Sequence, residues 1–230
     1  MKIEAIILAR KNSKGIQNKN ITNFCGRPLI EWTIIQLKKV INKNNIWVSS
    51  DSEEILKISK KNNVNCIIRP SSLSKDNSTS EDAWLHAINE IEKKKKFDAI
   101  LAPQITSPIR EPKDFKNGID LFINSKADSL LSVSEVEDYF FWELNNQDQP
   151  ISINYDFQNR KMRQFIKKKY LENGSFYIFK KNLIKKFNCR LGGKIVILPM
   201  EKYKMYQIDN ISDLKLCSVI MKGYKLNEQK

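Results

Sequence analysis

The residues with the clearest chemical potential form a basic loop after an apolar run near the start of the chain. The stretch reads ILARKNSKGIQNKNI (7–21), with one glycine, Gly15, among the cations Arg10, Lys11, Lys14 and Lys19. Glycine frees the backbone to present its amides to an anion, and the flanking cations can reach phosphate oxygens. Neither a Walker A pattern nor G-x-G-x-x-G is present. A loop from Arg10 to Pro28 is nevertheless long enough to suggest a function, and we expect it to bind a triphosphate.

Three further polar clusters follow apolar runs that read as strands. They are Ser49, Ser50 and Asp51; Arg69 with Asp76, Ser78, Thr79 and Ser80; and Gln104 with Thr106, Ser107 and Arg110. The carboxyl ends of parallel strands meet at one edge of a sheet, which is where such sheets bind ligands. We therefore expect amides, hydroxyls and two arginines beside the basic loop.

The elements that position these clusters alternate between strand and helix patterns. Continuous apolar runs predict strands at 3–9, 46–50, 64–69, 98–102, 128–133, 175–179 and 194–199. Amphipathic patterns predict helices at 28–41, 52–61, 81–94, 112–124 and 213–222. Ser52, Thr79, Pro112 and Asn210 carry the signals of helix starts. This alternation predicts an α/β fold with a doubly wound, mostly parallel sheet.

Length and composition narrow the class of protein. The chain has 230 residues, 41% hydrophobic and 29% charged, which suits a single packed domain over 1–230. No apolar stretch is long enough for a membrane helix or a signal peptide, so we expect a cytoplasmic protein that does not bind membranes. Four scattered cysteines and one histidine exclude a Cys/His zinc site and suggest reduced thiols.

The formal charge of +14 suggests an acidic partner, either nucleic acid or a phosphorylated small molecule. Much of the excess lies in lysine runs such as 93–96, 167–169 and 185–186, which we expect on solvated faces. Nucleic-acid binding rests on charge alone, because no aromatic RNP pattern, helix-turn-helix or zinc finger is present. We therefore expect no nucleic-acid partner.

One segment, residues 137–171, breaks the alternating pattern. It holds an aromatic cluster at 139–142, a polar linker with Pro150 and a basic end. We interpret it as a small inserted arm, whose aromatic residues form either a satellite core or an oligomer contact.

Six motifs in order resemble the acylneuraminate cytidylyltransferases, the family that activates sialic acid and related nonulosonic acids. They are ILARKNSKGIQNKN, SSDSEEI, RPSSLSKDNSTSED, PQITSPIR, RQFIKKKYLENGSFYIF and IDNISDL. The resemblance spans almost the whole chain and implies a Rossmann-like nucleotidyltransferase fold. It also implies transfer of CMP from CTP to the sugar acid, with release of pyrophosphate. Positioning and electrostatics would supply most of the catalysis.

The resemblance implies roles for individual residues. Those that would bind the nucleotide are Arg10, Asn12, Ser13, Lys14, Gly15, Lys19, Asn20, Arg69 and Ser80. Arg10, Lys14, Lys19 and Asp209 would carry catalysis, and Asp209 would bind Mg²⁺ or Mn²⁺. Those that would complete the sugar pocket are Gln104, Arg163, Gln164, Tyr170 and Asn173. In the family this sugar-pocket segment often belongs to the partner subunit, and the aromatic patch at 139–142 leads us to expect a homodimer by isologous pairing.

Two departures from the family pattern bear on function. Relatives commonly have D-x-D before the last helix, where this chain reads Gln207-Ile208-Asp209, so Gln207 is a candidate second ligand whose amide lacks the full charge. An arginine that often precedes the E/P-N-G turn is also missing at Tyr170-Leu171-Glu172-Asn173-Gly174. Three alternatives stay open: a Kdo-activating synthetase, a CTP-binding homologue with weakened turnover, and a nucleic-acid-binding protein.

Overall fold

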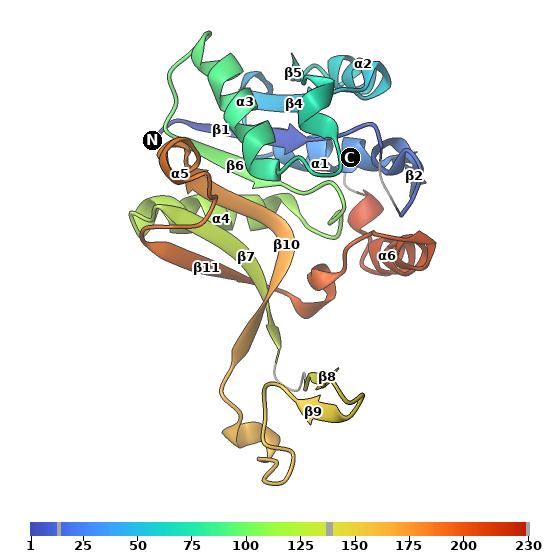
Figure 1. The fold of residues 1–230 in the computed structure, drawn as a ribbon. Coiled ribbons are helices and arrows are strands. Elements are labelled where there is room, and N and C mark those ends of the chain that lie inside the picture. Colours follow the sequence, from blue (N-terminus) through green and yellow to red (C-terminus); the bar gives the residue numbers. More distant parts are fainter. Residues whose placement is uncertain (13–14, 137–139, 229–230) are drawn as a thin grey trace.

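The computed structural model describes residues 1–12, 15–136 and 140–228. Within them, a seven-stranded sheet has the order β11-β7-β10-β6-β1-β4-β5 (Figure 1). Its strands are β1 (Ile3–Leu8), β4 (Ile46–Ser50), β5 (Asn65–Ile68), β6 (Ala99–Pro103), β7 (Ser129–Val136), β10 (Lys169–Lys180) and β11 (Ile195–Met200). All neighbouring strands are parallel except that β10 is antiparallel to both β6 and β7. The predicted α/β fold with a mostly parallel sheet is confirmed.

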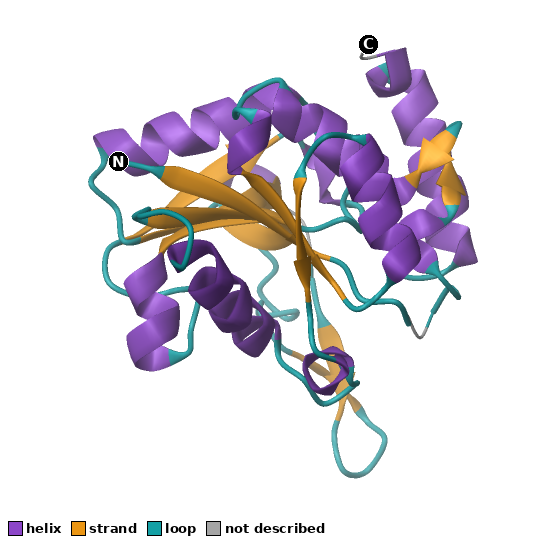
Figure 2. Ribbon diagram, turned by 90° about the horizontal axis from the view of Figure 1, so that it is seen from above, coloured by secondary structure: helices purple, strands orange, loops and turns teal. Residues whose placement is uncertain are grey.

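Helices cover both faces of this sheet, as Figure 2 shows from above. The helices are α1 (Leu29–Lys38), α2 (Glu53–Lys61), α3 (Ser80–Glu92), α4 (Pro112–Asn124), α5 (Lys181–Phe187) and α6 (Ile211–Gly223). Alternate strand residues face opposite sides: Ile7 packs in a core with α1, α2, α4 and α6, whereas Ile6 packs in a second core with α3 and α5. Two apolar layers therefore hold the sheet in the predicted doubly wound arrangement.

The predicted helix starts are correct and have visible causes. The Ser52 hydroxyl accepts a bond from the Ile55 amide, and the Thr79 hydroxyl accepts one from the Asp82 amide. Pro112 is the first residue of α4, and Asn210 forms a reciprocal capping box with Asp213 at α6. Each cap satisfies backbone donors that the first helical turn leaves unpaired.

Helix α5 and the environment of Lys95 differ from the sequence-based expectations. The α5 segment, KNLIKKF, has only two buried positions, Leu183 and Ile184, so its apolar pattern is too short to recognise. Lys95 is not on a solvated face, because its Nζ lies 2.7 Å from Oε2 of Glu4, a side chain only 3% exposed. The expectation that the whole 93–96 run is solvated is therefore wrong for Lys95.

The segment predicted as an arm leaves the sheet between β7 and β10 and projects from it (Figure 1). It carries the hairpin of β8 (Trp142–Leu144) and β9 (Pro150–Ser152). Tyr155 packs on Phe140, with ring centroids 4.1 Å apart, and Trp142 packs on both Tyr155 and Phe157. Residues 137–139, including Tyr139, lie outside the described part. The described rings form a small satellite cluster, although Trp142 and Phe157 remain about half exposed.

Two small strands, β2 (Asn23–Phe24) and β3 (Arg27–Pro28), form a hairpin that ends the basic loop before α1. All four cysteines are free, as expected. None of the helices in the described ranges is long and apolar enough to cross a membrane.

Candidate functional site

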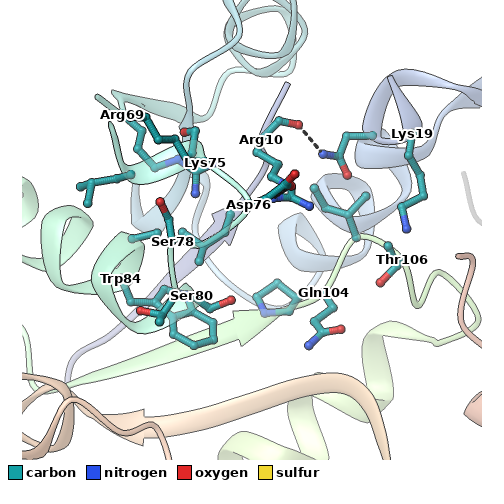
Figure 3. Close-up of a pocket in the computed structure, with 18 of the residues that line it drawn as sticks. Arg10, Lys19, Arg69, Lys75, Asp76, Ser78, Ser80, Trp84, Gln104 and Thr106 are labelled. Atoms are coloured by element: carbon teal, nitrogen blue, oxygen red, sulfur yellow. Dashed lines mark hydrogen bonds and ion pairs between the residues drawn. The ribbon is translucent and has the colours of Figure 1, made fainter. Parts of the chain in front are cut away.

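A cavity of about 700 Å³ opens at the carboxyl edge of the central strands (Figure 3). Its walls come from the end of β1 and the basic loop, the β5–α3 connection, the end of β6, and Asp209 before α6. This is the edge at which the sequence predicted a ligand site, and the reason is topological: parallel strands all end there. The volume is in the range of pockets that bind small molecules.

The cavity brings together eight of the predicted site residues from distant parts of the chain. These lining residues are Arg10, Gly15, Lys19, Asn20, Arg69, Ser80, Gln104 and Asp209.

One end of the cavity is cationic and is held by contacts with the segment before α6. The Lys19 ammonium donates to the Ile208 carbonyl at 2.9 Å and pairs with Asp209 Oδ1 at 3.0 Å. Gly15 packs so tightly that a Cβ there would lie 1.9 Å from the Asp209 carbonyl oxygen, so only glycine fits. The basic loop and Asp209 therefore form a single wall, although they are about 190 residues apart.

Arg10 approaches the same space from the end of β1. Its guanidinium pairs with Asp76 at 3.1 Å, and both side chains are substantially exposed. The side-chain amide of Asn20 donates from Nδ2 to the backbone carbonyl of Arg10 at 2.9 Å (Figure 3). This bond fixes the backbone where the loop leaves the strand. Exposed pairs of this kind contribute little to stability, so an anionic ligand can compete for Arg10 at small cost.

The other end of the cavity contains buried polar groups without protein partners. Arg69 is 5% exposed, and its Nε and Nη2 atoms have no hydrogen-bond acceptor among the residues that the structure describes; a carboxylate oxygen of Asp51 lies 3.9 Å from Nη2. Ser74 Oγ and Trp84 Nε1 are also buried without partners, and both residues line the cavity. Such groups are costly unless a ligand satisfies them.

Burial lowers the pKa of the Arg69 guanidinium; nearby Asp51 opposes this shift, and Arg10 adds to it. The same Asp51 carboxylate accepts a bond from the Lys11 amide at 2.8 Å, so it links the basic loop to the Arg69 end.

Arg110 does not belong to the site, contrary to the expectation of two arginines there. It is fully buried, and its guanidinium bonds to Gln36 and Thr33 side chains and to the Gln104 and Ser175 carbonyls. Burial lowers the pKa of Arg110 to about 9, opposed by Asp114. Its role is to tie α1, the 104–110 turn and β10 together beneath the cavity.

Several predicted residues lie away from the cavity lining. Asn12 is exposed beyond it, and Gln164 and Tyr170 are exposed on the arm side. Asn173 is buried, with Oδ1 accepting from Ser132 Oγ at 2.7 Å and Nδ2 donating to Ser134 Oγ at 3.2 Å. Ser13 and Lys14 lie outside the described residues, as does the side chain of Arg163.

The sequence did not point to several other lining residues, including Leu73, Ser74, Lys75 and Trp84, whereas Thr106, expected at this edge, does line the cavity. Trp84 could have been found, because it follows Ser80 by one helical turn and so shares a face of α3 with it. In the sequence it looks like an ordinary core residue, and one side of its ring does pack against Phe179.

Asp209 is a residue at the cavity that could hold a metal ion. Within the described ranges, no group of three or more His, Cys, Asp or Glu side chains is arranged so that it could hold a metal ion. Asp209 is 72% exposed at the cationic end and offers one carboxylate. Mg²⁺ commonly takes one or two protein carboxylates and completes its shell with substrate phosphates and waters, so this donor set fits a metal that arrives with a phosphorylated ligand.

Comparisons with known proteins agree with this geometry. The chain is 34% identical over 212 residues to N-acylneuraminate cytidylyltransferase A of Danio rerio, an alignment covering 90% of this chain and 48% of that protein. It is 28% identical over 238 residues to the pseudaminic acid cytidylyltransferase of Campylobacter jejuni, covering 100% and 99% respectively. The chain thus spans about half the length of the first of these relatives.

A solved structure of CMP:2-keto-3-deoxy-manno-octonic acid synthetase complexed with CTP superposes with a TM-score of 0.72 at 13% identity, covering 97% of this chain and 100% of that one. It shares the fold with this chain. The family model described as cytidylyltransferase matches residues 4–229. The cavity, cationic at one end and lined by buried polar groups at the other, agrees with this match. Because the family model covers almost the whole chain, this chain belongs to the cytidylyltransferase family.

Proposed function

We propose that the protein is a CTP-dependent cytidylyltransferase that activates a nonulosonic acid of the sialic acid type. The observation that carries the proposal is the pairing, in one cavity, of Lys19 and Arg10 at one end with unsatisfied Arg69 at the other. A nucleoside triphosphate has complementary parts: a polyanion and a base with hydrogen-bonding edges. The names of the relatives, N-acylneuraminate and pseudaminic acid cytidylyltransferases, support both the nucleotide and the sugar class.

In this reaction the anomeric hydroxyl of the sugar acid attacks the α-phosphorus of CTP. A new P–O bond forms as the bond from that phosphorus to the bridging oxygen breaks, and the bonding electrons leave with pyrophosphate. The hydroxyl proton is released to solvent water, which balances the overall exchange. Negative charge grows on the bridging oxygen, so positioned cations lower the barrier.

The described residues divide this work. Arg10 and Lys19 bind the phosphates, and Lys19 is already fixed by Asp209 and the Ile208 carbonyl, so little reorganisation is needed. Arg69 and Ser80 face the base and Asn20 the ribose side. Gln104, which lines the cavity and is labelled in Figure 3, contacts the sugar acid. Asp209 would hold Mg²⁺, or Mn²⁺, which would neutralise phosphate charge when bound.

The arm completes the enzyme as a homodimer in this proposal. Exposed apolar residues are concentrated on the described part of the arm: Phe141, Trp142, Leu144, Ile151, Ile153, Phe157, Met162 and Phe165. A second copy that presented the same surface would cover this patch by isologous pairing. Sedimentation velocity at micromolar concentration should give a dimer, whereas a fully active monomer would contradict the assembly.

The test of the function is pyrophosphate release from CTP in the presence of Mg²⁺ and a panel of sugar acids. We expect release with at least one acid among sialic, legionaminic and pseudaminic acids, and none without an acid. CTP should be used far better than ATP or GTP, because a wrong base leaves the buried donors of Arg69 unpaired. No release with any acid would refute the proposal.

The main competing activity is transfer to Kdo, favoured by the fold shared with the CTP-bound synthetase. The same panel separates the two, since Kdo as the preferred acceptor would move the protein to that branch.

A further inference from the structure

The segment before α6 is fixed to three other parts of the protein. The Ile208 amide donates to the Thr106 carbonyl at 2.7 Å, and the Ile208 carbonyl accepts from Lys19. The Asp209 amide donates to Asp213 at 2.9 Å. The backbone around Asp209 therefore has a single, well-defined path between the β6 turn, the basic loop and α6.

Gln207 adds a fourth attachment, through its side chain. Its Nε2 donates to the Asn173 carbonyl at 3.1 Å. The amide lies flat against Gly174, where a Cβ would meet Nε2 at 2.6 Å and the amide carbon at 3.0 Å. Gly174 has φ +63°, a left-handed conformation that glycine adopts without strain. The glycine thus provides both the turn and the space that the Gln207 amide fills.

The anchor on the other side is itself rigid. Asn173 lies at the base of the arm, in β10, and its side chain is held by Ser132 and Ser134 of β7. Its Oδ1 also accepts from the Ser175 amide at 3.0 Å. Gln207 consequently links the strands that lead into the arm to the segment that carries Asp209.

We propose that Gln207 is a structural anchor rather than a metal ligand: it holds the Asn173–Gly174 turn, and Asp209 alone presents a carboxylate to the metal. This inference rests on the proposed function, in which Asp209 holds the ion. Only the amide nitrogen can donate to a carbonyl, so the observed bond uses the donor end of the side chain. A carboxylate at position 207 has no donor and would face the Asn173 carbonyl with like partial charge.

The inference has a consequence for the metal. With one protein carboxylate, the ion is held largely by the phosphates of CTP, and it binds the nucleotide-free protein weakly. Replacing Gln207 should then leave metal affinity almost unchanged while it loosens the turn.

The test compares Gln207→Ala and Gln207→Glu with the wild type and with Gln147→Glu, a charge-matched control on the exposed β8–β9 turn. Mn²⁺ binding to the CTP-loaded protein is measured by electron paramagnetic resonance, and thermal unfolding is measured in EDTA without nucleotide. We expect both Gln207 variants to keep Mn²⁺ affinity within about twofold. We expect both to unfold about 2–4 °C lower, in keeping with the loss of a single hydrogen bond.

Two results would overturn the inference. One is a loss of Mn²⁺ affinity of tenfold or more in Gln207→Ala, or a gain of that size in Gln207→Glu, which would make position 207 a ligand. The other is an unfolding temperature equal to that of the control. Neither measurement depends on turnover, so a protein inactive with every sugar acid would refute the proposed function without deciding this one.

A double-mutant cycle gives an independent check on the turn. Gly174→Ala should lower the unfolding temperature in the wild type, because its Cβ meets the Gln207 amide. In the Gln207→Ala background the same substitution should lower the unfolding temperature by less, because the clash is gone and only the left-handed φ remains unfavourable. Equal costs in both backgrounds would show that the amide does not pack there.

Discussion

Replacing Arg69 with methionine should separate ligand binding from stability. In the free protein this buried guanidinium has two nitrogen atoms without acceptors. Each unsatisfied buried donor costs about 1–3 kcal/mol, so the pair destabilises the free fold by roughly 2–6 kcal/mol. Attraction to Asp51 at 3.9 Å offsets this by about 4 kcal/mol at an effective dielectric constant near 20.

These terms nearly cancel, and methionine preserves most of the side chain's volume. We therefore expect Arg69→Met to unfold within about 3 °C of the wild type in nucleotide-free buffer, or above it. CTP binding should weaken by about a hundredfold, because a hydrogen bond to a charged group, left unmade in a buried site, costs about 3 kcal/mol. Asp51 retains its bond from the Lys11 amide, so the loop should stay in place.

The assay is a thermal unfolding series with increasing CTP, because a ligand that binds only the folded state raises the unfolding midpoint more at a given concentration the more tightly it binds. The wild type should show a clear rise and Arg69→Met almost none, from nearly equal starting temperatures. A fall of 6 °C or more in the free variant, with an undiminished response to CTP, would show that Arg69 supports the fold and does not contact the base.

Other predictions concern charges at the site and beneath it. Lys19→Ala should lower turnover by about a hundredfold or more, because it removes a charge partner of the transition state. Lys96→Ala, on the exposed surface, should leave turnover unchanged, and equal rates for the two variants would show that the basic loop does not bind the phosphates. Asp209→Asn should nearly abolish turnover with an unchanged unfolding temperature, and full activity at low Mg²⁺ would leave Asp209 with no role beyond its ion pair with Lys19. Lys204→Met should cost about 3–5 kcal/mol of unfolding free energy, because fully buried Lys204 pairs with three carboxylates, and an unchanged denaturant midpoint would contradict this. Lys95→Ala should also destabilise, by leaving buried Glu4 without its ion pair, and a variant as stable as Lys96→Ala would refute that role.

Local patterns in the sequence were sufficient for most elements and for the edge at which the site lies. Caps such as Ser52 and Thr79 act within one helical turn, and apolar runs such as IEAIIL act within one strand, so neighbouring residues determine them. Because parallel strands bring their carboxyl ends together, placing Arg10, Arg69 and Gln104 near one another needed only the strand boundaries.

Contacts between distant residues could not be predicted in this way. Nothing in the sequence distinguishes buried Arg110 from cavity-lining Arg69, because both follow a strand and differ only in which neighbours surround them. The antiparallel direction of β10 likewise depends on the return path from the arm rather than on its apolar run.

The order of residues along short stretches determined that the chain would fold as an α/β domain with a cationic loop, because hydrophobic period and local charge are properties of such stretches. Only the tertiary structure decided which charges are paired. Lys19 meets Asp209, Lys95 meets Glu4 and Gln207 meets Asn173 across dozens to nearly two hundred residues of chain. Such pairs form where packing of the sheet and helices brings their backbones together, so the partner of each side chain is fixed by the fold and not by its sequence neighbours.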